Sequence, residues 1–252
     1  MGKYLNIGNA GFEAVRKGIY VDKTDMISYI NGVLGTTDKM LCVSRPRRFG
    51  KSFAAQMLCA YYDKSCDSKE LFQGLKISKD KNFETYLNKY LVIYLDITLF
   101  TSRTSDINTV VQDINREVTT EITHVFPNIE AGKDLAETLL HVTEKTGEKF
   151  IMIIDEWDAI FREARENTKL QKEYVTFLRS LFKSSWTDIV FEAAYLTGIL
   201  PIKKYGTQSA MTDFREYSML APKKLAEYVG FTEPEVRNLC NQYHMDFEKM
   251  KK

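Results

Sequence analysis

Short apolar runs alternate along the chain with longer stretches in which apolar residues recur at steps of three and four. Each run is rich in residues that suit burial on both faces of a sheet, as in parallel strands covered by helices. The runs cover residues 40–43, 91–97, 150–154, 189–196 and, less distinctly, 216–220. We therefore predict an α/β fold in which βα units build a mostly parallel sheet.

Two amphipathic stretches predict helices that cover this sheet. Their apolar residues have helical spacing, so packing explains them and we assign them no chemistry. The stripes are Ile107, Val110, Val111, Ile114, Val118 and Ile122 in the first stretch, and Leu170, Tyr174, Phe177, Leu178, Leu181 and Phe182 in the second. Thr232 and Glu235, with Pro234 between them, have capping-box spacing and predict a last helix outside the sheet. We expect a core domain over 1–221 and a small helical extension over 222–252, the start of a further region.

Composition is that of an ordinary globular protein. A formal charge of +1 predicts no general attraction to nucleic acid or to an anionic membrane. The N-terminus lacks a signal-peptide pattern, and no apolar run approaches the roughly 18 to 20 residues of a membrane span. The four cysteines have no metal-ligand spacing, and Cys42 and Cys59 lie in apolar segments. We expect a cytoplasmic protein with buried free thiols and no membrane partner.

The segment after the first strand carries the strongest chemical motif. It reads Ser-Arg-Pro-Arg-Arg-Phe-Gly-Lys-Ser over 44–52 and leads into a helical run. Backbone amides and the dipole of a helix that starts at such a loop attract phosphate. Lys51 would neutralise the β- and γ-phosphates, and Ser52 would coordinate Mg²⁺. The residues predicted to contact the nucleotide here are Arg45, Pro46, Arg47, Arg48, Phe49, Gly50, Lys51, Ser52 and Phe53.

The loop departs from the usual phosphate-binding pattern at its first position. The pattern G-x-x-x-x-G-K-[ST] has glycine where this chain has Arg45, so the loop entry should differ from the standard turn. The charge of Arg45, Arg47 and Arg48 suits a nucleotide, a second phosphate-bearing partner, or an acidic residue of the chain itself. In isolation, Gly-Lys-Ser indicates no more than a helix start with a surface lysine, but the strand before it and the helix after it favour nucleotide binding.

The third strand ends in two carboxylates, Asp155 and Glu156. The carboxyl ends of strands in an open α/β sheet are where such proteins bind ligands, so these side chains should lie beside the loop. We predict that Asp155 holds Mg²⁺, usually through water, and that Glu156 polarises the water that attacks the γ-phosphorus. Without the loop upstream, two acidic residues would merely end a strand at the surface.

Several neighbours of the strand ends are weaker candidates. Thr197, at the end of the fourth strand, is predicted to hydrogen-bond the γ-phosphate or the attacking water. We expect Trp157 to pack under the next helix, Asp158 and Arg162 to form a surface pair of small energetic weight, and Arg215 to form a surface salt bridge rather than act as an arginine finger. The three histidines form no cluster with acids or cysteines.

Taken together, the chain resembles the bacterial AAA-ATPase-like family of P-loop proteins. The resemblance spans almost the whole chain and rests on SRPRRFGKS at 44–52, IDEWD at 154–158, LTGIL at 196–200 and GFTEPEV at 230–236, with GIYVDKT at 18–24 and LFQG at 71–74. It implies a three-layer P-loop sandwich with sheet order 5-1-4-3-2. It also implies that Tyr20, Asp22 and Lys23 line the adenine side, although the residues around Asp22 by themselves indicate only a helix cap.

The function that we expect is ATP binding with Mg²⁺ and hydrolysis that drives a conformational change in an attached or partner domain. One alternative is a regulatory module that uses the nucleotide as a switch with little hydrolysis, since a finger arginine from another subunit can be worth roughly 10³ to 10⁵ in rate. Another is a nucleic-acid-binding accessory protein. Longer relatives continue into a nuclease-like domain, and oligomerisation is possible. The sequence does not distinguish ATP from GTP.

Overall fold

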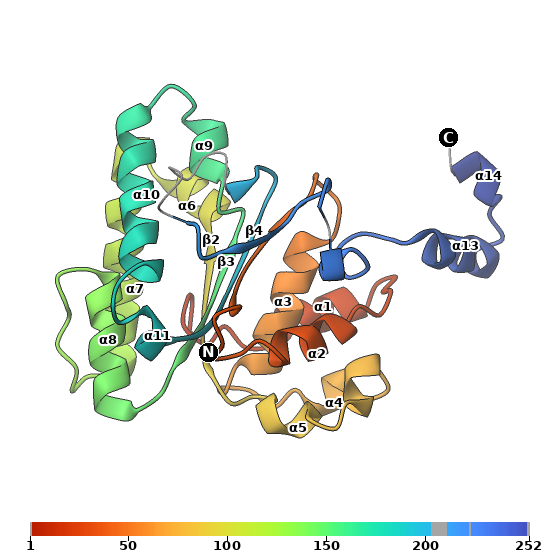
Figure 1. Ribbon diagram of the computed structural model, residues 1–252, viewed down its shortest axis with the longest axis horizontal. Helices are drawn as coiled ribbons and strands as arrows, with labels where there is room; N and C mark the ends of the chain where they lie inside the picture. Colours follow the sequence, from red (N-terminus) through yellow and green to blue (C-terminus); the bar gives the residue numbers. More distant parts are fainter. Residues whose placement is uncertain (1, 203–210, 222, 251–252) are drawn as a thin grey trace.

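A five-stranded sheet forms the centre of the computed structural model, which describes residues 2–202, 211–221 and 223–250. Its strands are β1 (Met40–Ser44), β2 (Leu91–Asp96), β3 (Phe150–Asp155), β4 (Phe191–Gly198) and β5 (Arg215–Tyr217). Every pairing between neighbours is parallel, and the order across the sheet is β2-β3-β4-β1-β5. This is the order 5-1-4-3-2 read from the other edge, so the fold implied by the family resemblance is confirmed (Figure 1).

The fourth and fifth strands differ from their predicted bounds. Thr187–Val190 forms a helical turn, α11. The Thr187 hydroxyl stabilises it by donating a hydrogen bond to the Leu181 carbonyl and accepting one from the Ser184 amide. The apolar run predicted as one strand from residue 189 is therefore a turn followed by β4. The fifth strand begins one residue early and ends at Tyr217, because it pairs only with Leu41, Cys42 and Val43 of β1.

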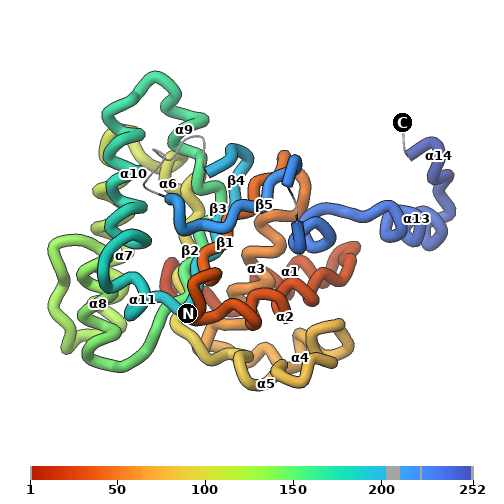
Figure 2. Tube along the Cα trace, in the orientation of Figure 1, coloured from red at the N-terminus to blue at the C-terminus, as the bar shows by residue number. Residues whose placement is uncertain are grey.

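Strand side chains alternate between two hydrophobic cores, one on each face of the sheet. Cys42, Ile93, Met152, Ala194 and Leu196 belong to one core. Their neighbours Val43, Val92, Ile153, Ala193 and Tyr195 belong to the other. Successive side chains of a strand point to opposite faces, so apolar runs without alternation require helices on both sides. Figure 2 shows those two helical layers with the sheet between them.

The helices on the face that includes the first core are α6 (Ile97–Arg103), the short η2 (Ile107–Thr109), α7 (Val110–Val125), α8 (Leu135–Thr146), α9 (Ala159–Glu163) and α10 (Thr168–Phe182). The opposite face is covered by α1 (Ala10–Arg16), α2 (Asp25–Asn31), α3 (Lys51–Tyr62), α4 (Lys69–Phe72), η1 (Lys76–Lys79) and α5 (Phe83–Tyr86). The two predicted stripes are the buried faces of α7 and α10, as expected; Ile107 lies just before α7 and is partly buried. All four cysteines are free thiols.

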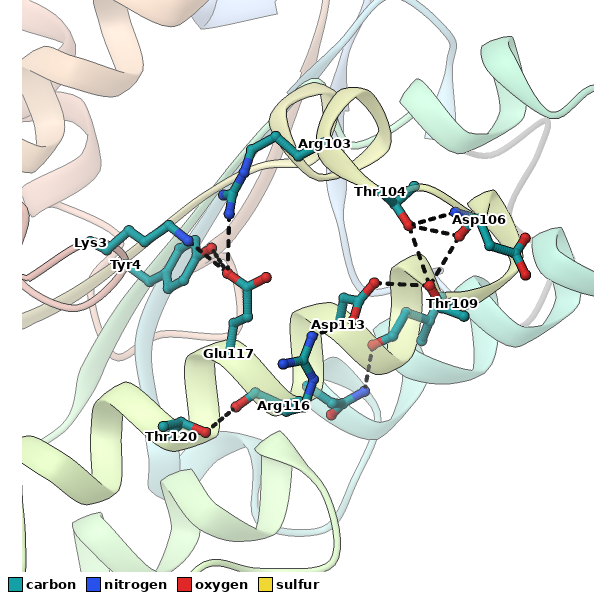
Figure 3. Close-up of polar contacts among 12 residues, drawn as sticks. Lys3, Tyr4, Arg103, Thr104, Asp106, Thr109, Asp113, Arg116, Glu117 and Thr120 are labelled. Atoms are coloured by element: carbon teal, nitrogen blue, oxygen red, sulfur yellow. Dashed lines mark hydrogen bonds and ion pairs between the residues drawn. The ribbon is translucent and has the colours of Figure 1, made fainter.

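The N-terminal segment closes the edge of β2. Asn6 donates its amide to the Val92 carbonyl at 2.7 Å and accepts the Val92 amide at 2.9 Å, which satisfies backbone groups that an edge strand would leave exposed. Lys3 and the Tyr4 hydroxyl both donate to Glu117 of α7, and Arg103 lies on the same carboxylate (Figure 3). The chain end is thus tied to the helical layer as well as to the sheet.

The last part of the chain leaves the body of the protein. After the short η3 (Lys223–Leu225), which packs Leu225 into the second core, α13 (Glu233–Gln242) and α14 (Phe247–Met250) lie away from both layers (Figure 1). The capping box of Thr232 and Glu235 is present, with proline in the first turn of α13, so the predicted last helix is confirmed. Residue 222, where the predicted extension begins, lies outside the described residues. Among those described, no helix is long and apolar enough to cross a bilayer.

Candidate functional site

The loop between β1 and α3 bends sharply around the start of the helix. Arg48 and Gly50 both have left-handed backbone conformations, with φ of 68° and 76°. A side chain at Gly50 would meet nothing within 4 Å, so the backbone conformation rather than a lack of space requires glycine there. Gly50 is the N-cap of α3, and a helix of this length presents unpaired amides and a positive dipole end to the loop.

The Arg45 side chain is directed into the fold. It is 2% exposed, and its Nη1 donates to the carbonyls of Ser44 at 3.0 Å and Tyr217 at 2.7 Å. Arg45 therefore joins the start of the loop to the edge strand β5. Its guanidinium is held by these backbone carbonyls, and the contact of Arg45 with the nucleotide stays a prediction. Burial lowers the pKa of Arg45.

Lys51 brings the loop and the end of β3 together. Its side chain is 4% exposed, and its Nζ donates to the Pro46 carbonyl at 3.1 Å and lies 3.5 Å from Glu156 Oε1. The two motifs that the sequence places about a hundred residues apart thus meet in one site. Ser52 and Arg47 line the same opening, with Lys51 and Glu156.

Asp155 accepts hydrogen bonds on both of its oxygens. The Thr197 hydroxyl donates to Oδ1, and the Tyr94 hydroxyl donates to Oδ2 at 3.3 Å. A threonine hydroxyl has one proton to donate, so that of Thr197 is committed to Asp155. In this arrangement Thr197 positions the carboxylate of Asp155. Its contact with the γ-phosphate or the attacking water stays a prediction, because the hydroxyl oxygen can still accept a hydrogen bond. No local pattern in the sequence indicates Tyr94, which comes from the neighbouring strand β2.

Glu156 lies between two cations. Its backbone is left-handed, with φ of 50°, and its side chain is 22% exposed. Oε1 faces Lys51, and Oε2 accepts a hydrogen bond of 2.5 Å from Arg162 Nη2. Burial raises the pKa of Glu156, although Lys51 and Arg162 both oppose that rise. The carboxylate is thus less acidic than an exposed glutamate, as suits a group that accepts a proton near neutral pH.

Asp158 is fully buried and the Arg162 side chain is 14% exposed, which corrects the prediction of a surface pair. The Oδ2 of Asp158 accepts the amides of Ile199 at 3.1 Å and Leu200 at 2.8 Å. Arg162 Nε lies 3.2 Å from the same oxygen, a charge contact rather than a directed hydrogen bond. The contact of Arg162 with Glu156 was not predictable from the sequence, because it spans six positions and depends on the turn after β3.

Beside the loop is an apolar pocket of about 150 Å³. Three segments far apart in the sequence line it: Tyr20 and Lys23 from before β1, Phe49 and Phe53 from the loop and α3, and Tyr228 with Gly230 and Phe231 from after β5. Arg48, Gly50 and Phe53 line both this pocket and the polar opening at Lys51. An apolar pocket continuous with a cationic one suits a ligand that has a ring system at one end and anionic groups at the other.

Of the three residues implied on the adenine side, Tyr20 and Lys23 line this pocket and Asp22 does not. Asp22 accepts the Thr24 amide at 2.9 Å and the Lys76 amide at 2.7 Å. Asp22 thus caps backbone amides, as the residues around it alone indicate, and the implied contact of Asp22 with the nucleotide stays a prediction. Trp157 is buried and packs edge-on against Phe161, as expected, and Arg215 pairs with Asp38 at the surface.

Comparison with known proteins places the chain in a family. A family model described as predicted AAA-ATPase, AAA-ATPase-like, matches residues 6–207. No curated protein matches. Among solved structures, the ORC2 protein of Aeropyrum pernix, in its ADPNP-ADP complexes, matches with 12% identity and a TM-score of 0.42. That match covers 92% of this chain but 50% of the ORC2 chain. Because the family model takes in the loop, the acidic strand end and four of the five strands, the chain belongs to the AAA-ATPase-like family.

Proposed function

We propose that this protein binds ATP with Mg²⁺ at the loop of residues 46–52 and hydrolyses it with Glu156 as the general base. The observation that carries the proposal is the 3.5 Å approach of Lys51 Nζ to Glu156 Oε1, which joins a phosphate-binding loop to a carboxylate whose pKa burial has raised. Membership of the AAA-ATPase-like family supports nucleotide binding. That the bound nucleotide is hydrolysed is inferred from the geometry around Glu156.

The phosphates would lie on the backbone amides of the loop. Lys51 is the cation of the loop that faces Glu156, and Arg47 and Arg48 are exposed at the same opening. Their charge therefore suits the phosphates of the ligand, which makes a separate nucleic-acid contact unnecessary. Binding of ATP would draw Lys51 towards the phosphates and away from its present partners, the Pro46 carbonyl and Glu156.

The residues present fit a magnesium ion that is held partly through water. Ser52 and Asp155 offer the hard oxygen donors that Mg²⁺ prefers. Asp155 is 2% exposed and both of its oxygens accept hydrogen bonds, so a bridging water suits it better than direct coordination. Bound Mg²⁺ would neutralise charge that develops between the β- and γ-phosphates. Among the described residues, no group of three or more His, Cys, Asp or Glu side chains is placed to hold a metal ion. In this proposal, the nucleotide and water supply the remaining ligands.

The nucleobase would occupy the apolar pocket beside the loop. Phe49 and Phe53 offer aromatic surface, and burial keeps the pKa of Tyr20 well above its usual range, so its phenol stays neutral. A base that stacks here would also touch Tyr228 and Phe231, which belong to the segment after β5. Nothing in this lining distinguishes adenine from guanine by charge.

The same pocket supports coupling to the C-terminal helices. Gly230 approaches the ring of Phe49 so closely that an added Cβ would lie 2.8 Å from Cδ1. Lys23, at the other wall, donates to both oxygens of Glu235 at 2.6 Å and to the Glu227 carbonyl, and Glu235 also caps α13. Because the pocket wall and the first turn of α13 share these residues, filling the pocket would change how residues 222–252 are held against the core at 1–221.

Calorimetric titration with ATP and with GTP, each with Mg²⁺, tests binding and nucleotide identity together. We expect Lys51→Ala to abolish binding and Glu156→Gln to retain it while turnover falls by roughly 10² to 10⁴. Equal turnover in the wild type and Glu156→Gln would refute the assignment of the base. Tight binding with negligible turnover at every protein concentration would instead favour a nucleotide-dependent switch.

A further inference from the structure

Arg162 of α9 contacts one oxygen of Glu156 and leaves the other to face the loop. Arg162 Nη2 lies 2.5 Å from Oε2, whereas Oε1 is the oxygen that lies 3.5 Å from Lys51 Nζ. The two oxygens of the carboxylate therefore have different partners, from different elements. Lys51 belongs to the phosphate-binding loop, and Arg162 does not.

Arg162 also contacts a second carboxylate, that of Asp158, which is itself fixed in place. Asp158 carries no exposed surface, and two backbone amides of the segment after β4 fix its Oδ2. Arg162 spans from this fixed carboxylate to Glu156, with 14% of its own side chain exposed. A planar guanidinium can engage two carboxylates at once, so its position against Asp158 determines where it meets Glu156.

We expect Lys51 and Arg162 to respond differently when nucleotide binds. Lys51 would move towards the phosphates, as the proposed function requires, and Oε1 would lose its partner. Arg162 has no phosphate to follow and would stay on Oε2. Oε2 therefore keeps its partner in both states, so Arg162 is the contact that would fix the orientation of the carboxylate after Lys51 has moved.

We propose that Arg162 is a positioning residue for hydrolysis, one that holds Glu156 through Oε2 and presents Oε1 to the attacking water. This inference rests on the proposed function. In the step itself, the water oxygen bonds to the γ-phosphorus, the bond from that phosphorus to the bridging oxygen breaks, ADP leaves, and the water proton passes to Oε1 and later to solvent. Arg162 takes no part in bond making.

The test is a double-mutant cycle on kcat for ATP hydrolysis by the full chain. Arg162→Gln keeps a hydrogen-bond donor but loses the charge. We expect kcat to fall roughly tenfold or more, with ATP affinity unchanged because Arg162 does not belong to the phosphate-binding loop. Added to Glu156→Gln, Arg162→Gln should cause no further loss, because its partner is already disabled. Arg162→Lys keeps the charge and should retain part of the rate. Arg116→Ala, which removes an exposed arginine paired with Asp113 in α7, should change neither kcat nor ATP affinity.

An equal further loss of kcat when Arg162→Gln is added to Glu156→Gln would overturn the proposal, because general loosening of the fold lowers the rate whether or not Glu156 is intact. Thermal unfolding of each variant accompanies the assay. If Arg162→Gln does not fold, Arg162→Lys decides the question: a further loss of rate on the Glu156→Gln background would contradict the role given to Arg162.

Failure of the proposed function would be recognised separately. If the wild type does not turn over ATP, or Glu156→Gln matches it, Glu156 is not the base and Arg162 has no step to assist. The contact itself can still be tested by ¹⁵N NMR of the Arg162 guanidinium, assigned by its loss in Arg162→Gln. A changed guanidinium shift in Glu156→Gln would support the contact without turnover, and an unchanged shift would overturn it.

Discussion

Gly198 ends β4 against the turn that carries Glu156, and replacing it with alanine should disturb both. An added Cβ would lie 2.7 Å from Cδ1 and Nε1 of Trp157 and 2.8 Å from Oδ1 of Asp158. Trp157 and Asp158 are fully buried, so neither can swing into solvent. Overpacking of this kind costs about 1–3 kcal/mol. For a chain of this size each kcal/mol lowers the melting temperature by roughly 2–4 °C, so we expect a fall of about 2–12 °C.

Thermal and urea unfolding of Gly198→Ala would measure this cost against a matched control. Gly18→Ala adds the same methyl group at an exposed position, where the nearest neighbour of the Cβ is the Val15 carbonyl at 3.6 Å. The control should be neutral or slightly more stable, because alanine restricts the unfolded chain. If Gly198→Ala unfolds at the same temperature as Gly18→Ala, the contacts with Trp157 and Asp158 do not constrain this turn and the reasoning is refuted.

Three further predictions concern other parts of the molecule. Burial raises the pKa of Glu117, but hydrogen bonds from Lys3 and Tyr4 outweigh it, and the net pKa is lowered. The ionised Glu117 therefore stabilises the fold above the ordinary glutamate pKa, and this stabilisation is lost as the pH falls through the lower pKa of the folded state. Glu117→Gln should lower the free energy of unfolding by roughly 0.5–1 kcal/mol at pH 7 and not at all in acid. Urea unfolding at both pH values measures the difference. Lys23→Ala should speed hydrogen exchange in α13 and leave exchange in β3 unchanged; equal protection of α13 would contradict the link through Glu235. Gly230→Ala should weaken ATP binding, measured by calorimetry, more than Gly74→Ala does. Gly74 also has a positive φ, but a Cβ added there would meet nothing within 4 Å. Equal affinities of the two variants would argue against Phe49 as a wall of the base pocket.

The sheet was predictable because its strands carry their own signal. The runs that become β1, β2 and β3 are apolar up to their last residues, Ser44, Asp96 and Asp155, and such runs are typical of strands that are buried on both faces. The start of β4 was not predictable, because Ile189 continues an apolar run while its side chain is half exposed in a turn. Hydrophobicity alone does not separate a turn from a strand when both contain apolar residues.

The site was predictable where it depends on consecutive residues. Gly50, Lys51 and Ser52 follow a strand and begin a helix, and Asp155 and Glu156 end a strand, so the parallel sheet brings both groups to one edge. The directions of individual side chains were not predictable. Arg45 turns towards the Tyr217 carbonyl because β5 happens to lie beside β1, and no local pattern around Arg45 encodes that neighbour.

By itself, the sequence determined the alternation of strands and helices, the phosphate-binding loop and the acidic end of β3. Each of these depends on residues that are adjacent or regularly spaced in the sequence. The tertiary structure alone decided that Thr197 and Tyr94 hold Asp155, that Asp158 is buried, and that Arg162 meets Glu156. Those contacts join residues from different strands and turns. Their strength depends on burial and on distances below about 4 Å, and only packing sets these.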